Sequence, residues 1–140
     1  MNKFKISKLK LEGTYIIETN SFTDKRGVFS RFFCKNELRD IVQDKEILNI
    51  NYSKNYKKGS VRGLHFQKNS PQGKLVSVIN GSILDIAIDI RKNSKTFGKY
   101  VGLTMSDKDD FSFYIPEGFA HGFLCISKEC TVNYKCSKYR

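Results

Sequence analysis

The chain has 140 residues, of which 39% are hydrophobic and 28% are charged, a composition that excludes a disordered chain and fits one globular domain. Its formal net charge of +11 favours an anionic partner, but no run of lysines is longer than Lys57-Lys58. We therefore interpret the charge as a solvated surface rather than a nucleic-acid-binding stripe. No apolar run approaches membrane-spanning length, so we expect no membrane partner.

The four cysteines form neither a C-x-x-C pair nor a zinc-type spacing. The first ten residues also lack the apolar core of a secretion signal. We therefore expect reduced thiols in a cytoplasmic protein.

The first half of the chain predicts one helix and one strand. Leu38, Ile41 and Val42 have helical spacing, which predicts a helix over about residues 35–43. Short runs between Gly, Asn and Ser residues are typical of strands, and one such strand is expected at about residues 60–67.

The clearest hairpin spans residues 74–91, with the turn-forming pair Asn80-Gly81 at its tip. After the turn, aliphatic residues alternate with Asp85 and Asp89 along one strand. We expect the aliphatic side to pack against a second layer and the acidic side to line a cavity.

Two further strands are expected, at residues 119–123 and 131–135. In the first of them, alternation places His121 between two phenylalanines on one face. The number of short strands predicts an all-β fold, a barrel or jelly roll with minor helix, as a single domain over residues 1–140.

The chain has only two histidines, His65 and His121, and each lies in a strand-like segment with glycines nearby. One such histidine is ordinarily structural, but two of them near predicted carboxylates indicate a site that moves protons near neutral pH. Metal binding is the first alternative. Because His65-x-Gln67 lacks the second histidine and the carboxylate of a typical cupin metal site, we expect no metal.

Short motifs occur in a fixed order over most of the chain. They are DKRGVF at 24–29, RGLHFQ at 62–67, QGKLV at 72–76, DIRKNSKTFG at 89–98, IPEGFAHGF at 115–123 and YK at 134–135. Each is weak alone, but the ordered set resembles the dTDP-4-dehydrorhamnose 3,5-epimerase family. The resemblance implies a cupin-type jelly-roll β-barrel, a homodimer, no cofactor and an isomerase that acts on a nucleotide-diphosphate sugar.

Members of that family remove protons from the carbons beside the C4 ketone of a 4-keto-6-deoxy sugar and return them on the opposite face. The resemblance implies that His65 is the base, that Lys74 steadies the enolate oxygen and that Tyr134 is the acid. These residue types suit the chemistry, because an enolate oxygen needs a fixed positive charge and a phenol can donate a proton. Without the family, Lys74 could be a surface lysine and Tyr134 a core residue.

The resemblance also assigns seven residues to substrate binding. His121 and Asp89 are expected to line the sugar pocket, and the others match positions around the nucleotide or sugar. The full set is Arg26, Phe29, Asn51, Arg62, Gln67, Asp89 and His121.

The chain departs from the family pattern in the expected nucleotide region. Arg31 stands where the family has an acid after its first arginine, and NINYS at 49–53 replaces the usual Gln-Asp-Asn-x-Ser. Our hypothesis is that the base need not be thymine, and that a GDP-linked 4-keto sugar such as a heptose is an alternative to a dTDP-linked one.

The family also continues beyond the position of Arg140, through a segment with an aspartate that pairs with the catalytic histidine. No residue of this chain matches that aspartate, so we expect low activity from the chain as given.

The sequence thus predicts an epimerase that inverts C3, C5 or both, in deoxysugar synthesis for a bacterial surface polysaccharide such as lipopolysaccharide or capsule. Two alternatives stay open: a 3,4-ketoisomerase of the same substrate class, and a non-catalytic cupin that binds sugar nucleotides. Nucleic-acid binding driven by charge is the least supported class, because no recognisable motif accompanies the lysines.

Overall fold

The computed structural model describes residues 4–42, 45–69 and 71–137. Over these residues the chain is β-structure with one short helix, α1, at Arg39–Val42. The strands in chain order are β1 (Lys5–Lys8), β2 (Tyr15–Glu18), β3 (Phe22–Asp24), β4 (Gly27–Phe29), β5 (Asn49–Asn55), β6 (Val61–His65), β7 (Lys74–Asn80), β8 (Ser82–Asp89), β9 (Tyr100–Ser106), β10 (Phe111–Ile115), β11 (Phe119–Cys125) and β12 (Cys130–Cys136). The predicted all-β fold with minor helix is confirmed.

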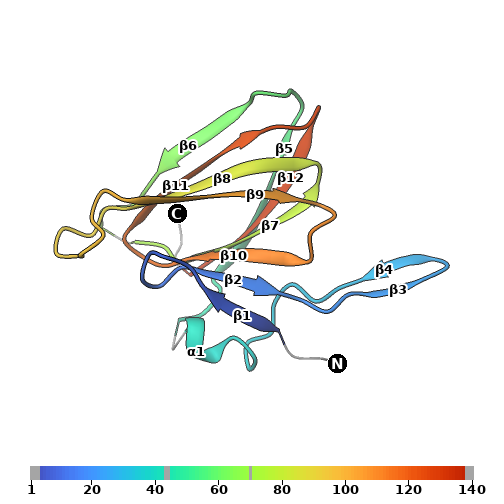
Figure 1. The fold of residues 1–140 in the computed structure, drawn as a ribbon, viewed down its shortest axis with the longest axis horizontal. Coiled ribbons are helices and arrows are strands. Elements are labelled where there is room, and N and C mark those ends of the chain that lie inside the picture. Colours follow the sequence, from blue (N-terminus) through green and yellow to red (C-terminus); the bar gives the residue numbers. More distant parts are fainter. Residues whose placement is uncertain (1–3, 43–44, 70, 138–140) are drawn as a thin grey trace.

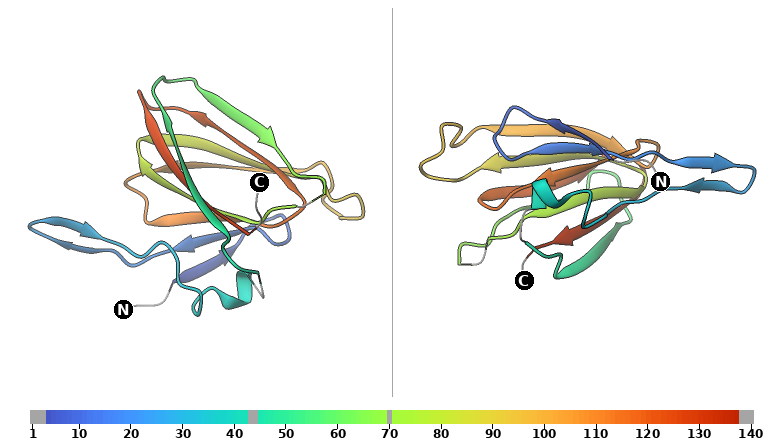
Figure 2. Two further views of the ribbon diagram at one scale, coloured as in Figure 1. Left: turned by 180° about the vertical axis from the view of Figure 1, so that it is seen from behind. Right: turned by 90° about the horizontal axis from the view of Figure 1, so that it is seen from below.

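The described strands form two large antiparallel sheets and one small hairpin (Figure 1). The six-stranded sheet has the order β1-β2-β10-β7-β12-β5, and the four-stranded sheet has the order β6-β11-β8-β9. The hairpin β3–β4 projects away from the body formed by both sheets, as the two further views also show (Figure 2).

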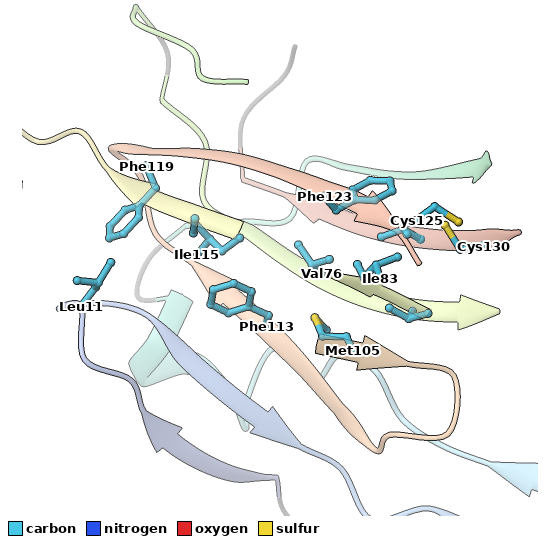
Figure 3. Close-up of a cluster of buried hydrophobic side chains, with 13 residues drawn as sticks. Leu11, Val76, Ile83, Met105, Phe113, Ile115, Phe119, Phe123, Cys125 and Cys130 are labelled. Carbon is cyan, nitrogen blue, oxygen red and sulfur yellow. The ribbon is translucent and has the colours of Figure 1, made fainter. Parts of the chain in front are cut away.

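The inner faces of the two large sheets enclose the main apolar core (Figure 3). Val76 and Phe113 of the six-stranded sheet are fully buried there, against Ile83 and Phe123 of the four-stranded sheet. Burial of such side chains is the chief stabilising contribution to a fold of this kind. The core holds the two sheets at the spacing that leaves room for a cavity at one end.

The predicted helix is shorter in the structure than its periodicity suggested. Regular helix covers only Arg39–Val42, and residue 43 lies outside the described residues. Leu38 and Val42 are nevertheless buried, against Leu75 and Tyr114 on the outer face of the six-stranded sheet. The spacing of the apolar residues correctly identified the buried side of this segment. The regular helix is about one turn long, and a helix this short depends on packing against the sheet for its stability.

The hairpin predicted over residues 74–91 is confirmed as β7 and β8. Gly81 makes the turn with a φ of +80°, and a Cβ on it would lie 2.2 Å from the carbonyl oxygen of Glu129. Only glycine fits this position, because it tolerates both the left-handed backbone and the close approach of the neighbouring loop.

The predicted packing of β8 was wrong for its aliphatic side. The acidic side of the strand faces the opposite sheet, where Asp85 and Asp89 are both 0% exposed, and the aliphatic side is partly exposed on the outer surface. Buried carboxylates are tolerated only with strong partners. Each has one here: His121 contacts Asp85, and Arg91 donates to Asp89.

Two glycines allow β6 to lie very close to β11. Gly63 has a φ of +104°, and a Cβ on it would lie 2.7 Å from the carbonyl oxygen of His121. A Cβ on Gly122 would lie 2.6 Å from the carbonyl oxygen of Arg62. The pairing register shifts just beyond this point, which leaves His65 directly opposite His121.

The strands predicted over residues 60–67, 119–123 and 131–135 are confirmed as β6, β11 and β12. The strands β1 to β5, β9 and β10 were not predicted. Of these, β3 and β4 have three residues each and are exposed throughout. No helix in the described ranges is long and apolar enough to cross a membrane.

Candidate active site

A cavity of about 520 Å³ is lined by side chains from both large sheets. Strands β5, β7 and β12 of the six-stranded sheet contribute, as do β6 and β11 of the four-stranded sheet. Most of the lining residues are polar or basic: Asn49, Asn51, Ser53, Arg62, His65, Gln72, Lys74, His121, Gly122, Phe123, Tyr134 and Cys136.

The edge strand β5 supplies a polar wall by simple alternation. Asn49, Asn51 and Ser53 point into the cavity, while Ile50 and Tyr52 between them are 62% and 71% exposed on the outside. Because these inward residues are amides and a hydroxyl rather than aliphatic, the apolar core stops here and a polar cavity begins.

The candidate base and the candidate acid lie on opposite walls. His65 and His121 belong to the four-stranded sheet and face each other across β6 and β11. Tyr134 and Lys74 belong to the six-stranded sheet, on β12 and β7. The rings of His121 and Tyr134 meet edge to face, with centroids 6.3 Å apart and planes at 77°. A ligand between the walls therefore has the two histidines on one side and Tyr134 and Lys74 on the other.

A buried carboxylate orients His121. The Nε2 atom of His121 lies 2.7 Å from Oδ1 of Asp85, and the side chains are 4% and 0% exposed. This short contact holds the imidazole of His121 in one orientation. The sequence placed Asp85 on the cavity face of its strand, but the structure makes it a support behind His121.

Tyr134 is held in its protonated form. Burial raises the pKa of its phenol to about 12, although a hydrogen bond with Ser53 and the nearby charge of Arg62 act to lower it. The Oγ atom of Ser53 lies 3.0 Å from the phenol oxygen. A protonated phenol on one wall of a polar cavity is suited to donate a proton to a bound ligand.

The structure brings together six of the ten residues assigned from the sequence: His65, Lys74, Tyr134, Asn51, Arg62 and His121 all line this cavity. Gln67 lines a smaller adjoining cavity of about 40 Å³, which shares three residues with the first.

Asp89 does not line the cavity, contrary to the expectation from the sequence. Burial acts to raise the pKa of its carboxyl, but hydrogen bonds from Arg91, Ser94 and Thr96 outweigh burial and hold that pKa below its usual value. The side chain of Ser94 donates to Asp89 at 2.6 Å and that of Arg91 at 3.0 Å. Asp89 therefore organises the loop between β8 and β9.

Arg26 and Phe29 are also distant from the cavity of their own chain. Both lie on the projecting hairpin β3–β4, where Phe29 is 61% exposed and Arg26 forms an ion pair with Asp24 at 2.6 Å. That hydrogen-bonded arginine keeps the pKa of Asp24 below its usual value.

The sequence did not single out several residues that line the cavity, among them Ser53, Phe123 and Cys136. Alternation along β5 and β12 could have indicated them, since Ser53 follows Asn51 by two residues and Cys136 follows Tyr134 by two. Among the described residues, no group of three or more His, Cys, Asp or Glu side chains could hold a metal ion. All four cysteines are free thiols.

Comparison with known proteins gives a consistent result. The family model for dTDP-4-dehydrorhamnose 3,5-epimerase matches residues 8–140. The dTDP-4-dehydrorhamnose 3,5-epimerase of Methanothermobacter thermautotrophicus is 46% identical, over 99% of this chain and 74% of that protein. The enzyme of the same name from Shigella flexneri is 40% identical, over 96% of this chain and 75% of that protein.

Solved structures agree with the sequence comparison. A dTDP-6-deoxy-D-glucose-3,5-epimerase from Legionella pneumophila, in complex with dTDP-4-keto-L-rhamnose, superposes with a TM-score of 0.94 at 38% identity, over 98% of this chain and 73% of that one. A Bacillus anthracis dTDP-4-dehydrorhamnose 3,5-epimerase with TDP and pyrophosphate bound gives 0.92 at 33% identity, over 98% and 79%. The cupin-type fold is thereby confirmed, and this chain, an isomerase, belongs to the dTDP-4-dehydrorhamnose 3,5-epimerase family.

Proposed function

We propose that this protein epimerises a dTDP-linked 4-keto-6-deoxy sugar at C3, C5 or both, by way of an enolate. The observation that carries the proposal is the placement of His65 and Tyr134 on opposite walls of one cavity, with Lys74 beside them. Inversion needs a proton to leave one face of a carbon and another to arrive at the opposite face. Two proton-carrying side chains on facing walls meet that requirement.

Each side chain has a distinct role in the proposed mechanism. His65 removes the proton next to the ketone, and the ammonium of Lys74 stabilises the negative charge that develops on the enolate oxygen. Tyr134, whose pKa is raised to about 12 by burial, then donates its proton from the other wall. His121, held by Asp85, fixes the sugar between them.

The nucleotide is proposed to be bound at the end of the cavity formed by β5 and β6. Asn51 offers an amide from β5, and Arg62 offers a guanidinium suited to a diphosphate. We prefer dTDP to GDP, because the similar structures from Legionella pneumophila and Bacillus anthracis contain a dTDP-sugar and TDP. A comparison of the dissociation constants of dTDP and GDP tests this choice, and tighter binding of GDP would reverse it.

The mechanism is tested by incubating the protein in D₂O with dTDP-4-keto-6-deoxyglucose and following C3 and C5 by NMR and mass spectrometry. We expect deuterium at one or both carbons together with inversion, and loss of both in His65→Ala. Migration of the carbonyl instead would indicate a 3,4-ketoisomerase. Binding of dTDP without exchange of any carbon-bound proton would indicate a non-catalytic sugar-nucleotide-binding protein.

We further propose a homodimer, in which the projecting hairpin of one chain contributes to the cavity of the other. Arg26 and Phe29 match nucleotide-binding positions of the family, yet the hairpin that carries them leads away from their own cavity. The exposed apolar side chains of this hairpin, Phe22, Val28 and Phe29, are also what an intersubunit contact would bury.

We place the enzyme in deoxysugar synthesis for a surface polysaccharide.

A further inference from the structure

Asn55 is a buried polar residue at the end of β5, behind the cavity wall. It is 4% exposed and does not line the cavity, although it is on the same face of the strand as Ser53. Its Oδ1 atom accepts a hydrogen bond of 2.6 Å from Nε of Arg62. Its Nδ2 atom lies 3.3 Å from Oγ of Ser53 and 3.4 Å from the carbonyl oxygen of Cys130.

The chemistry of these partners fixes which way the amide of Asn55 points. The guanidinium of Arg62 can only donate, so the atom facing it must be the amide oxygen. The amide nitrogen therefore faces Ser53, whose hydroxyl oxygen lies at 3.3 Å, and the carbonyl oxygens of Ser53 and Cys130 lie at 3.4 Å. The flip ambiguity of an asparagine side chain does not arise at this position.

The contact with Asn55 also bears on the proton of Ser53. It occupies one of the two acceptor sites of the Ser53 oxygen, which favours donation by the Ser53 O–H to the phenol oxygen of Tyr134, 3.0 Å away. In that arrangement the phenol accepts from Ser53 and keeps its own proton for another acceptor, whereas in the reverse arrangement Tyr134 donates to Ser53. Tyr134 lines the cavity, where a bound ligand can supply that acceptor.

We propose that Asn55 is a positioning residue for epimerisation, which orients the Tyr134 proton into the cavity through Ser53 and holds Arg62 at the nucleotide end. This inference rests on the proposed function. One buried amide thereby couples the group proposed to bind the diphosphate to the group proposed to donate the proton, and it does so without touching substrate.

The energetics support a catalytic use of this path. When Tyr134 gives up its proton, the phenolate is left in a buried environment that strongly disfavours it. The hydrogen bond from Ser53 and the charge of Arg62 both lower the pKa of Tyr134 and so oppose that penalty. Asn55 contacts both of these groups.

The decisive variant is Asn55→Asp, which keeps an oxygen for Arg62 but replaces the donor toward Ser53 with an acceptor. The O–H of Ser53 then turns to the new carboxylate, and Tyr134 donates to Ser53 instead of to the cavity. We expect the rate of inversion to fall about tenfold relative to the rate of deuterium exchange without inversion. This is the effect expected when one hydrogen bond is lost. The dissociation constant of dTDP should rise as well, because the new carboxylate offsets the charge of Arg62, so the ratio of inversion to exchange is the readout for this variant.

The matched comparison is Asn55→Ala, which removes both contacts. This variant should lose inversion relative to exchange and should also bind dTDP about tenfold more weakly. Asn133→Ala serves as the control, because Asn133 precedes Tyr134 on the same strand but contacts Lys135 instead. A purely structural role would lower exchange and inversion equally in Asn55→Asp, and that result would overturn the inference.

A second measurement keeps the inference testable if the wild-type protein does not turn over the sugar, an outcome that defeats the proposed function alone. A fluorinated, more acidic tyrosine is placed at position 134 and titrated spectroscopically. Asn55→Ala and Ser53→Ala should each raise its pKa, and the double variant should raise it by less than the sum of the two, because both act in part through Ser53. Additive effects, or no effect of Asn55→Ala, would overturn the inference.

Discussion

Tyr134 shows how the surroundings of a single residue define its chemistry. The phenol lies between Phe123 and His121, with ring centroids 6.3 Å away in both cases, and its oxygen contacts Ser53. This half-buried setting keeps the proton on the phenol at neutral pH, and Tyr134 lines the cavity. In the proposed mechanism, Tyr134 acts only in the step that delivers a proton to the enolate.

Tyr134→Phe should therefore separate the two halves of the reaction. His65 can still remove a proton and return one to the same face, so we expect deuterium in recovered substrate. Inversion at the carbon that Tyr134 serves should fall by about a hundredfold or more, which is the usual contribution of a general acid. Integration of the NMR signals of substrate and product in D₂O measures both. Equal loss of exchange and inversion would contradict this division of roles.

Lys135 follows Tyr134 but lies on the opposite face of the strand, away from the cavity. It is 6% exposed, and its Nζ atom contacts Oδ1 of Asn133 and the ring of Phe32, 5.0 Å from the ring centroid. Burial lowers the pKa of Lys135 to about 8 from the ordinary 10.5. The folded protein thus holds a proton on this lysine less tightly than the unfolded chain does.

Lys135→Met should change how stability depends on pH. Between about pH 8 and about pH 10.5 the unfolded chain binds more protons at Lys135, so this residue makes the wild-type protein more stable as pH rises. The variant lacks that contribution. We expect the difference in unfolding free energy between the two proteins to change by about 1–3 kcal/mol across this range. Urea unfolding at several pH values measures it, and parallel curves would contradict the assignment.

At the scale of elements, the hairpin β3–β4 is the part of the described chain whose position the two large sheets do not explain. It pairs within itself, and Phe22, Val28 and Phe29 on it are all exposed. A short two-stranded ribbon is barely stable in water unless something packs against it. The proposed dimer supplies that contact and brings Arg26 to a nucleotide.

A shared site makes a specific prediction for mixed dimers. Arg26→Ala and Arg62→Ala should each bind dTDP poorly. If Arg26 of one chain and Arg62 of the other bind the same nucleotide, a mixed dimer has one intact site and one that lacks both arginines. About half of the dimers in a refolded equimolar mixture are mixed, so the mixture should recover about a quarter of the wild-type sites. Binding stoichiometry by calorimetry measures this fraction. No recovery in the mixture, with dimers present, would mean that both residues of a site come from the same chain.

At the scale of the whole molecule, the net charge of +11 accompanies a cavity that itself contains Arg62 and Lys74. Dispersed lysines raise the local concentration of an anionic ligand without contacting it. This effect acts over a Debye length, about 8 Å at physiological salt, and is therefore screened by added ions.

The rate constant for dTDP association should therefore fall several-fold as salt is raised from low to physiological strength, roughly as expected for steering by a charged surface. Stopped-flow measurements at a series of salt concentrations give this dependence. Thymidine, which carries no phosphate, is the matched control and should show none. A salt-independent rate for dTDP would assign the surface lysines to solubility alone.

The sequence predicted the hairpin β7–β8 and the strands β6, β11 and β12, but it missed β1 to β5, β9 and β10. Residues 119–123 alternate strictly, and their strand lies in the middle of a sheet with one face against the core. The strands β3 and β4 have no buried face in the chain by itself, so no alternation marks them. Alternation also shows that the two faces of β8 differ, but it cannot show that the aliphatic face is the outer one. The acidic face can be buried because each of its carboxylates has a strong partner.

By itself, then, the sequence determined the all-β class, the hairpin at Gly81 and the identity of His65, Lys74 and Tyr134 as candidates, since turn chemistry, period and motif are local properties. Only the tertiary structure decided which of these residues share a cavity. Asp89 does not line the cavity, because residues of its own loop supply its hydrogen bonds. Asn55 contacts both Arg62 and Ser53, because the fold brings these two residues to one buried amide. Such contacts join residues that no sequence period connects.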